Sequence, residues 1–329
     1  MLLVGAVVMV AVFAFLFPQL GNYEQAFAQL AAIPPLWIVA LVAAGVLNIV
    51  VYPFTATAAI PTLAYRHAFV DRQVGFLISN VIPGGGAVAV GFQYTILSRY
   101  GVTATAAAAA VSADAVWTYL MTLGTPAFAV LLLVVEGRSA AGYTTIAVIG
   151  LIAVVVSLIA IIAVLRSPTS AGRLGGRLQR PADWLCGRLH RTPPDVQARL
   201  VEFNLHASAL VATRWRMLTL TNVAAQLTPY VVLVCALAGL GAFPDPVSWV
   251  EVFAAYSIAL LLTSFPITPG GLGTVDAALV LLLTRFGVDS STAIAADLIW
   301  RLVWFLPQLV VGLGAFGIFT WDQRKDRRA

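Results

Sequence analysis

The sequence predicts an all-α polytopic membrane protein in which two inverted-topology repeats each carry a re-entrant half-helix pair broken at Pro-Gly-Gly. Three observations support this fold class: an apolar composition, a gathering of basic residues into two segments, and a motif that occurs twice. Of 329 residues, 60% are apolar and 10% are charged, and the mean hydropathy is +0.93. A soluble domain carries roughly a quarter charged residues, so a chain this apolar requires lipid as its solvent.

About six or seven hydrophobic helices are expected, because a spanning helix needs about 20 apolar residues. Two apolar stretches, 73–99 and 249–286, are interrupted in the middle by Pro and Gly. The stretch 103–135 exceeds one crossing, which predicts a tilt or a kink near Pro126. No Lys or Arg precedes the first stretch, which favours a retained helix over a signal peptide. The uninterrupted candidates are 2–17, 36–60, 103–135, 143–165, 217–241 and 290–320.

The basic residues predict the orientation, because Lys and Arg are enriched in cytoplasmic loops. The segment 166–216 contains nine arginines against three acidic residues, and four more basic residues follow Trp321. We therefore expect both termini in the cytoplasm of a multi-pass cell-membrane protein, with 18–35, 136–142 and 241–248 outside. The net charge of +5 then reflects topology, and we expect no nucleic-acid partner. The basic segment is either a solvated loop or an interfacial helix on anionic lipid.

A motif at the first interrupted stretch recurs in the second. Residues 82–102 read IPGGGAVAVGFQYTILSRYGV, and residues 268–288 read TPGGLGTVDAALVLLLTRFGV. At a constant offset of 186 residues, Pro83, Gly84 and Gly85 match Pro269, Gly270 and Gly271. The identities fall on Pro, Gly and Arg positions rather than scattering among apolar residues. We interpret the chain as one transmembrane domain with repeat 1 at about 36–135, a basic cytoplasmic loop at 166–216 and repeat 2 at about 217–320.

The predicted orientation relates the two repeats by inverted topology, an arrangement that in transporters places a substrate site near the bilayer midplane. The halves of each interrupted stretch are too short to cross the bilayer comfortably, so each is expected to be a re-entrant hairpin. The half-helices that begin near Ala87 and Thr274 would point their N-termini at the membrane centre, which favours an anion such as phosphate. The alternative is a simple kink between packed helices that binds nothing.

Polar residues at membrane depth complete the candidate site. Asp276 is expected to cap the second half-helix, to repel an anion or to exchange a proton. Arg301 follows Asp297 by four residues, a spacing that permits an ion pair and leaves a phosphate-binding role open. Asp114 lacks a local partner and is expected to pair across helices. The predicted substrate-binding residues are Asn80, Pro83, Gly84, Gly85, Gly86, Gln93, Asp114, Pro269, Gly270, Gly271, Gly273, Asp276, Asp297 and Arg301.

At these residues the chain resembles the lysylphosphatidylglycerol synthase transmembrane-region family, also called the flippase-like domain family. The resemblance rests on Asn80–Gly86, on Pro266–Asp276 and on Arg301 followed by an apolar helix, and it extends over about residues 36–318. It implies movement of lipids or lipid-linked intermediates between leaflets. The chain departs from the family pattern at Asp276, where Glu is more frequent, and at Asp114, where no Glu–Arg pair is evident. These 329 residues contain no synthase segment, so we expect no aminoacyl transfer.

The expected function is therefore a flippase-like transporter of a phospholipid or a polyprenyl-phosphate-linked intermediate, with a membrane lipid as partner and its anionic headgroup or phosphate in the site. Candidate protein partners are a second copy of the chain or an enzyme of envelope biosynthesis. Two alternatives stay open: a membrane enzyme acting on lipid phosphate, and a small-solute transporter or channel. We expect no catalytic residues, no metal and no cofactor, because no His lies near the turns and neither cysteine has metal-ligand spacing.

Overall fold

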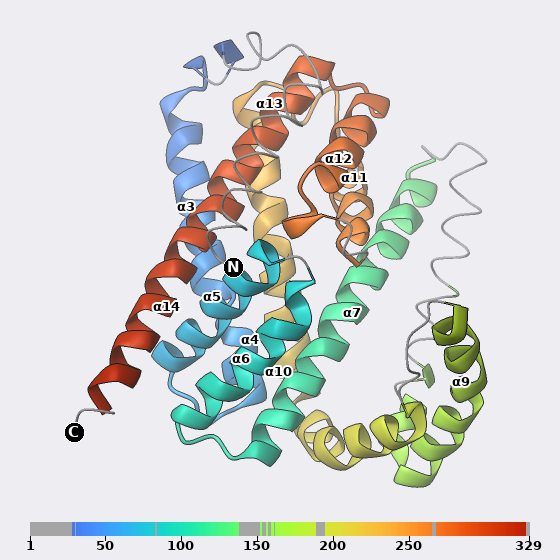
Figure 1. The fold of residues 1–329 in the computed structure, drawn as a ribbon. Helices are drawn as coiled ribbons and strands as arrows, with labels where there is room; N and C mark the ends of the chain where they lie inside the picture. Colours follow the sequence, from blue (N-terminus) through green and yellow to red (C-terminus); the bar gives the residue numbers. More distant parts are fainter. Residues whose placement is uncertain are drawn as a thin grey trace.

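The computed structural model describes residues 28–29, 31–82, 84–137, 162–188, 195–264 and 268–326, together with residues 152, 156, 159 and 160. Every regular element in these ranges is a helix, so the all-α prediction is confirmed for the part described. The expected helix at 2–17 and most of the one at 143–165 lie outside the described residues. Figure 1 shows most of the helices as one bundle, with α9 to one side.

Four helical stretches in the described ranges are long and apolar enough to cross a membrane. They match the predicted stretches at 36–60, 103–135, 217–241 and 290–320. Their outer faces expose apolar side chains such as Leu36 and Val135, each about three-quarters exposed, which fits lipid contact. The elements are α3 (Pro35–Val51) with α4 (Phe54–Ala59), α7 (Ala104–Val135), the second part of α10 (Val196–Gly239), and α13 (Ser290–Trp300) continuing through the π-helical η4 (Arg301–Phe305) into α14 (Leu306–Asp326).

Local chemistry explains where these helices begin and end. Pro35 opens α3, because its fixed φ suits the first helical position and its missing N–H would have no helical partner there. Thr103 caps α7 through its side chain, which accepts a hydrogen bond from the Ala106 N–H at 3.3 Å. Pro126 lies inside α7, yet the helix is continuous to Val135.

Both interrupted stretches break at their Gly clusters. The first forms α5 (Tyr65–Val81) and α6 (Gly85–Arg99), and Gly84 between them has φ 67°, a left-handed conformation that favours glycine. The second forms α11 (Trp249–Leu261), the short 3₁₀ turns η2 (Leu262–Ser264) and η3 (Pro269–Gly271), and α12 (Thr274–Arg285). Gly270 and Gly271 also have positive φ. Neither stretch is a continuous helix.

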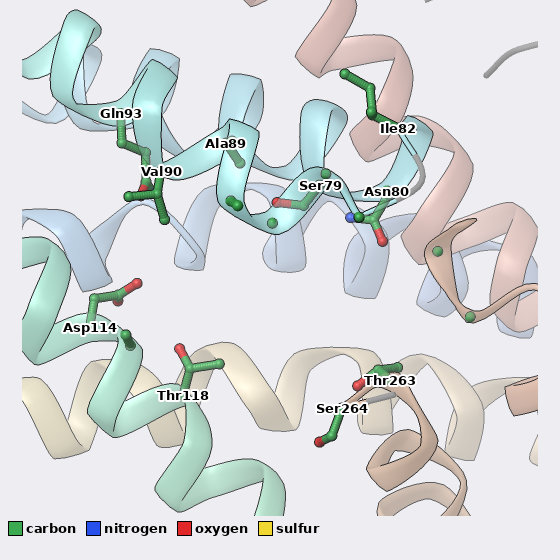
Figure 2. A pocket seen from close by; sticks show the side chains of 18 of the residues that line it. Ser79, Asn80, Ile82, Ala89, Val90, Gln93, Asp114, Thr118, Thr263 and Ser264 are labelled. Carbon is green, nitrogen blue, oxygen red and sulfur yellow. The ribbon is translucent and has the colours of Figure 1, made fainter. Parts of the chain in front are cut away.

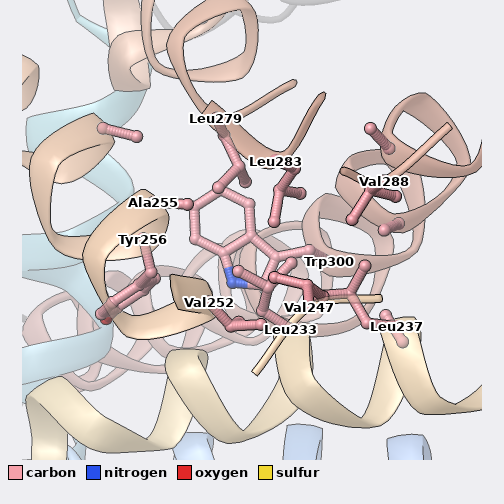
Figure 3. Close-up of a cluster of buried hydrophobic side chains, with 14 of the residues drawn as sticks. Leu233, Leu237, Val247, Val252, Ala255, Tyr256, Leu279, Leu283, Val288 and Trp300 are labelled. Atoms are coloured by element: carbon pink, nitrogen blue, oxygen red, sulfur yellow. The ribbon is translucent and has the colours of Figure 1, made fainter. Parts of the chain in front are cut away.

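The largest buried cluster surrounds Trp300 and holds α10, α11, α12 and α13 together (Figure 3). The indole is fully buried, and its Nε1–H donates to the carbonyl of Pro229 at 2.9 Å. Lipid tails are as apolar as these side chains, so close packing stabilises the cluster in a membrane more than removal from water does. The cluster fixes the position of α12 beside α13, on which the polar contacts described below depend. Its neighbours include Leu233, Leu237, Val252, Ala255, Leu279 and Leu283.

The basic segment is helical where the structure describes it. It forms α9 (Pro168–Arg188) and the first part of α10, which begins at Val196 rather than near 217. Asp195 starts α10 by accepting a hydrogen bond from the Ala198 N–H at 2.8 Å. In Figure 1, α9 lies beside the bundle at the end where α14 and the C-terminus lie, and it packs mainly against α10.

Asp289 caps α13 from the loop before it and gives the fold a pH-dependent contact. Hydrogen bonds from the hydroxyl and the N–H of Ser291 lower the pKa of the Asp289 carboxyl below its ordinary 3.8. A lowered folded-state pKa stabilises the protein above pH 3.8, and this stabilisation is lost as the pH falls through the folded-state value. We expect Asp289→Ala to lower the thermal midpoint in detergent at neutral pH, and the difference from wild type to shrink at acidic pH.

The matched control is Asp289→Asn, because Asn caps a helix about as well as Asp but does not titrate. Its thermal midpoint at neutral pH should be close to that of the wild type. A difference between wild type and Asp289→Ala that stays constant from neutral pH to below pH 3.8 would contradict the assignment of this cap.

Candidate functional site

A cavity of about 610 Å³ lies between the α5–α6 pair, α7 and the turns η2 and η3. This volume falls within the range of roughly 300–1,000 Å³ found for small-molecule sites. Figure 2 shows Gln93 pointing toward the gap from α6, with Asp114 and Thr118 facing it from α7. The wall is rich in uncharged hydrogen-bonding groups, an unusual lining inside an apolar bundle: Ser79, Asn80, Gln93, Thr118, Thr122 and Thr268.

The cavity brings together most of the residues predicted from the sequence, and both Gly clusters contribute to its wall although they are 186 residues apart in the chain. Gly273, Asp276, Asp297 and Arg301 lie outside the cavity lining, and Pro83 lies outside the described residues. The predicted residues that do line it are Asn80, Gly84, Gly85, Gly86, Gln93, Asp114, Pro269, Gly270 and Gly271.

The charged part of the cavity wall is an ion pair between Arg72 of α5 and Asp114 of α7. The Arg72 Nη1 donates to Asp114 Oδ2 at 2.6 Å, and the side chains are 6% and 17% exposed. Asp71 lies farther from the same guanidinium, at 3.9 Å, and the ring of Tyr52 lies 5.9 Å from it. The pair neutralises Asp114 across helices, as expected, but its partner Arg72 is a deep cation that sequence reasoning did not identify.

The N-terminal turn of α6 forms another part of the wall. Its N-cap residue Gly84 has no side chain and therefore supplies no capping hydrogen bond. Gly85, Gly86 and Ala87 of this turn all line the cavity. A helix N-terminus carries a partial positive charge and presents backbone N–H groups, so this turn is suited to an anionic group.

Gly85 allows α5 and α6 to approach closely at the cavity. A Cβ atom at this position would lie 2.2 Å from the carbonyl oxygen of Ile78 on α5. Because the obstructing atom belongs to the backbone, no side-chain rotation could relieve the contact. Gly86, one residue later, has no atom within 4 Å of the equivalent position. Two neighbouring glycines therefore have different roles, one in helix packing and one in the open cavity wall.

The N-terminus of α12 differs from that of α6 because a carboxylate occupies it. Asp276 Oδ2 accepts a hydrogen bond from the Gly273 N–H at 2.5 Å, and Asp276 Oδ1 accepts one from Arg301 Nε at 2.5 Å. Arg301 also donates to the carbonyls of Gly270 at 3.3 Å and Gly271 at 3.4 Å. Its guanidinium lies 5.0 Å from the centre of the Trp300 ring. Of the three roles considered for Asp276, the structure shows capping.

The expected i, i+4 ion pair between Asp297 and Arg301 is not the one that forms. Arg301 pairs with Asp276 instead, because from η4 its guanidinium can bind this carboxylate and the turn carbonyls together. Asp297 is 1% exposed, interacts electrostatically with both Asp276 and Arg301, and its Oδ1 accepts no hydrogen bond from any described residue. Arg301 is 2% exposed and directed into the turn, which places it behind the cavity wall rather than in it.

Comparison with known proteins assigns the family. The sequence model of the lysylphosphatidylglycerol synthase TM region matches residues 2–312 of the chain, nearly its whole length. The chain belongs to this family. It is also 31% identical over 78 residues to a UPF0104 membrane protein of Methanothermobacter thermautotrophicus, and the match covers 24% of this chain and 23% of the relative. The sequence resemblance to the lysylphosphatidylglycerol synthase transmembrane-region family is thereby confirmed.

Membership of the lysylphosphatidylglycerol synthase transmembrane-region family identifies a membrane domain and is consistent with a lipid-related function. It does not by itself identify the residues of the site, and Arg72 is the clearest example. The predicted interrupted stretch, 73–99, begins one residue after Arg72 and therefore does not include it. The sequence did contain a signal for such a partner: Asp114 lies alone in an apolar helix, and a carboxylate in that position is expected to pair with a cation from another helix.

Besides Arg72 and Asp114, the ionisable residues that line the cavity in the described part of the chain are Tyr52 and Tyr119. His67 stacks on Tyr100 at 3.9 Å between ring centres, and neither residue lines the cavity. Within the part of the chain that the structure describes, no three His, Cys, Asp or Glu side chains come together in a way that could hold a metal ion. The chemistry that the described wall provides is hydrogen bonding, one ion pair and the dipole of α6.

Proposed function

We propose that this protein is a flippase-like transporter that moves a phospholipid or a polyprenyl-phosphate-linked intermediate between the leaflets of the cytoplasmic membrane. The observation that carries the proposal is a cavity with a polar wall and a buried ion pair within a bundle whose outer surface is apolar. A lipid has the same division, with a polar headgroup that needs hydrogen bonds and tails that can stay in the bilayer. Membership of the family supports a lipid-related role.

In this proposal the headgroup enters the cavity and its phosphate is bound by the N-terminal turn of α6. Arg72 lines the same wall, and because Asp114 accepts from its Nη1, the other N–H groups of the guanidinium can donate to the phosphate. The hydroxyl and amide groups of residues such as Thr118 and Gln93 replace water around the rest of the headgroup. Arg301 then acts as a clamp that holds η3 in shape rather than as a phosphate ligand.

The proposed topology follows from the arrangement of charges in the sequence. Both termini and the basic segment lie in the cytoplasm, and the α5–α6 and α11–α12 pairs are re-entrant elements of two inverted repeats in one transmembrane domain. Rocking of one repeat against the other would expose the cavity to each leaflet in turn. A second copy of the chain and an enzyme of envelope biosynthesis remain the proposed protein partners.

The test is lipid movement by the purified protein in liposomes. We expect fluorescent phospholipids of at least one headgroup class to flip faster with the wild type than in protein-free liposomes. Gly86→Leu is expected to slow this movement severely, because Gly86 lines the cavity and has open space into which a side chain would extend. The accessible fraction of the fluorescent lipid is followed over time by quenching from outside.

The matched control is Gly91→Leu. Gly91 lies on the same helix and also has no atom within 4 Å of an added Cβ, but it does not line the cavity. Its flipping rate should be close to that of the wild type. If the wild type accelerates no lipid across several headgroup classes, or if both variants slow movement equally, the transport proposal fails.

A further inference from the structure

The outer face of α9 carries a basic stripe that the proposed transport function does not use. Arg173, Arg177, Arg180, Trp184 and Arg188 follow one another at spacings of four, three, four and four residues. At about 100° per residue, these spacings keep all five within roughly 80° of the helix circumference. All five are exposed, and Trp184 is 62% exposed. We name this set the α9 stripe.

The opposite face of α9 is fixed against α10, so the stripe is presented by a packed helix. A Cβ atom at Gly175 would lie 2.5 Å from the Cα of Gln197, which shows how closely the two helices approach. The Val196 N–H also donates to Gln179 Oε1 at 2.8 Å and joins the start of α10 to α9. The face that α10 leaves uncovered is the one that carries the arginines.

The composition of the stripe indicates which partner it fits. Leu178 is 45% exposed on the flank of the helix, about 80° from the edge of the stripe. The Trp184 ring lies 5.0 Å from the guanidinium carbon of Arg188. A helix with several Arg, an exposed Trp and an exposed Leu on its flank has the composition of one that lies on a membrane surface and binds anionic lipid headgroups. Such a surface is within reach, because α9 is joined through α10 to a stretch apolar and long enough to cross the bilayer.

We propose that the α9 stripe is a binding site for anionic lipid headgroups, which holds the α9–α10 unit on the bilayer surface. Arginine binds phosphate through two N–H groups at once, and Trp prefers the depth of the headgroups. The site is separate from the cavity and takes lipids that are not being transported. An acidic protein is the competing partner, and the experiment below distinguishes it from lipid.

The test uses the full-length protein in lipid nanodiscs. Both native cysteines, Cys186 and Cys235, are replaced by Ser, and Gly187→Cys supplies a spin-label site at the edge of the stripe, where an added side chain meets no atom within 4 Å. We expect nanodiscs rich in phosphatidylglycerol, compared with purely zwitterionic ones, to protect the label from a water-soluble nickel relaxant and to increase its exposure to oxygen.

Arg180→Gln and Arg285→Gln form a matched pair, because both remove one exposed arginine but Arg285 ends α12, away from α9. The ratio to be measured is that of protein with its label at the membrane surface to protein with its label in water. Arg180→Gln should reduce this ratio about fivefold, the effect expected for one arginine near an anionic surface. Arg285→Gln should leave the ratio unchanged. Equal nickel exposure in both types of nanodisc, or equal effects of the two variants, would overturn the proposal. Protection by soluble poly-glutamate but not by anionic lipid would overturn it in favour of an acidic protein.

Discussion

Arg301→Gln is expected to lower the free energy of unfolding by about 3–5 kcal/mol, the usual cost of removing one partner from a buried ion pair. The substitution leaves the Asp276 carboxylate, which is fully buried, without its cation. The carbonyls of Gly270 and Gly271 lose their donors at the same time. The thermal midpoint and the chemical-unfolding midpoint of the purified protein in detergent are the measurements.

Arg285→Gln is the matched control for this prediction, because it removes an arginine that is exposed at the end of α12. It should change the free energy of unfolding by less than about 0.5 kcal/mol. Adding Asp276→Asn to Arg301→Gln should recover part of the loss, since the amide no longer requires a cation. A midpoint for Arg301→Gln equal to that for Arg285→Gln would show that the clamp does not stabilise the fold.

Gly85→Ala is expected to destabilise the protein by about 1–3 kcal/mol, whereas Gly86→Ala should be neutral or stabilising by up to about 1 kcal/mol. At Gly85 the added methyl would lie 2.2 Å from a backbone oxygen of α5, so α5 and α6 must separate. At Gly86 the methyl meets no atom within 4 Å, and alanine favours the helix more than glycine does. The two unfolding midpoints are compared in the same detergent.

The opposite signs make this pair of glycine variants informative. General intolerance of the Gly cluster to side chains would shift both midpoints downward, which would contradict the distinction between a packing glycine and a cavity glycine. An unfolding midpoint for Gly85→Ala equal to that of the wild type would contradict the close approach of α5 and α6 at this residue. Gly86→Ala also tests whether the cavity wall tolerates small side chains before the larger Leu is introduced there.

The sequence predicted the helices well because the relevant signals are local. Runs of apolar residues define the four long stretches, and the Gly clusters near 84 and 270 mark the breaks, since positive φ favours glycine. The starts of α7 and α12 likewise have local causes: Thr103 caps α7 from the preceding position, and Asp276 in the first turn of α12 accepts from the Gly273 N–H. The same Gly clusters line the candidate cavity, so these local signals also predicted part of its wall.

The ion pairs could not be predicted in this way, because each connects helices that are distant in sequence. A helical period identifies neighbours three or four residues apart, and it therefore suggested Asp297 for Arg301. The actual partner Asp276 is 25 residues away, and Arg72 meets Asp114 across 42 residues. Only packing of the elements decides such contacts. The first part of α10 was left open between a solvated loop and an interfacial helix, because its charges fit either one.

The starts of α6 and α12 are capped differently, although the two segments are similar in sequence. At the start of α12 the Asp276 carboxylate caps the Gly273 N–H and is itself paired with Arg301, whereas the start of α6 has only Gly84 before it. If the proposed transport takes place, a negatively charged group would have its lowest electrostatic energy beside α6, whose N-terminus has no side-chain cap. Two segments that are similar in sequence would then differ in role. The start of α6 would bind the anionic group, and the turn before α12 would form a rigid part of the wall.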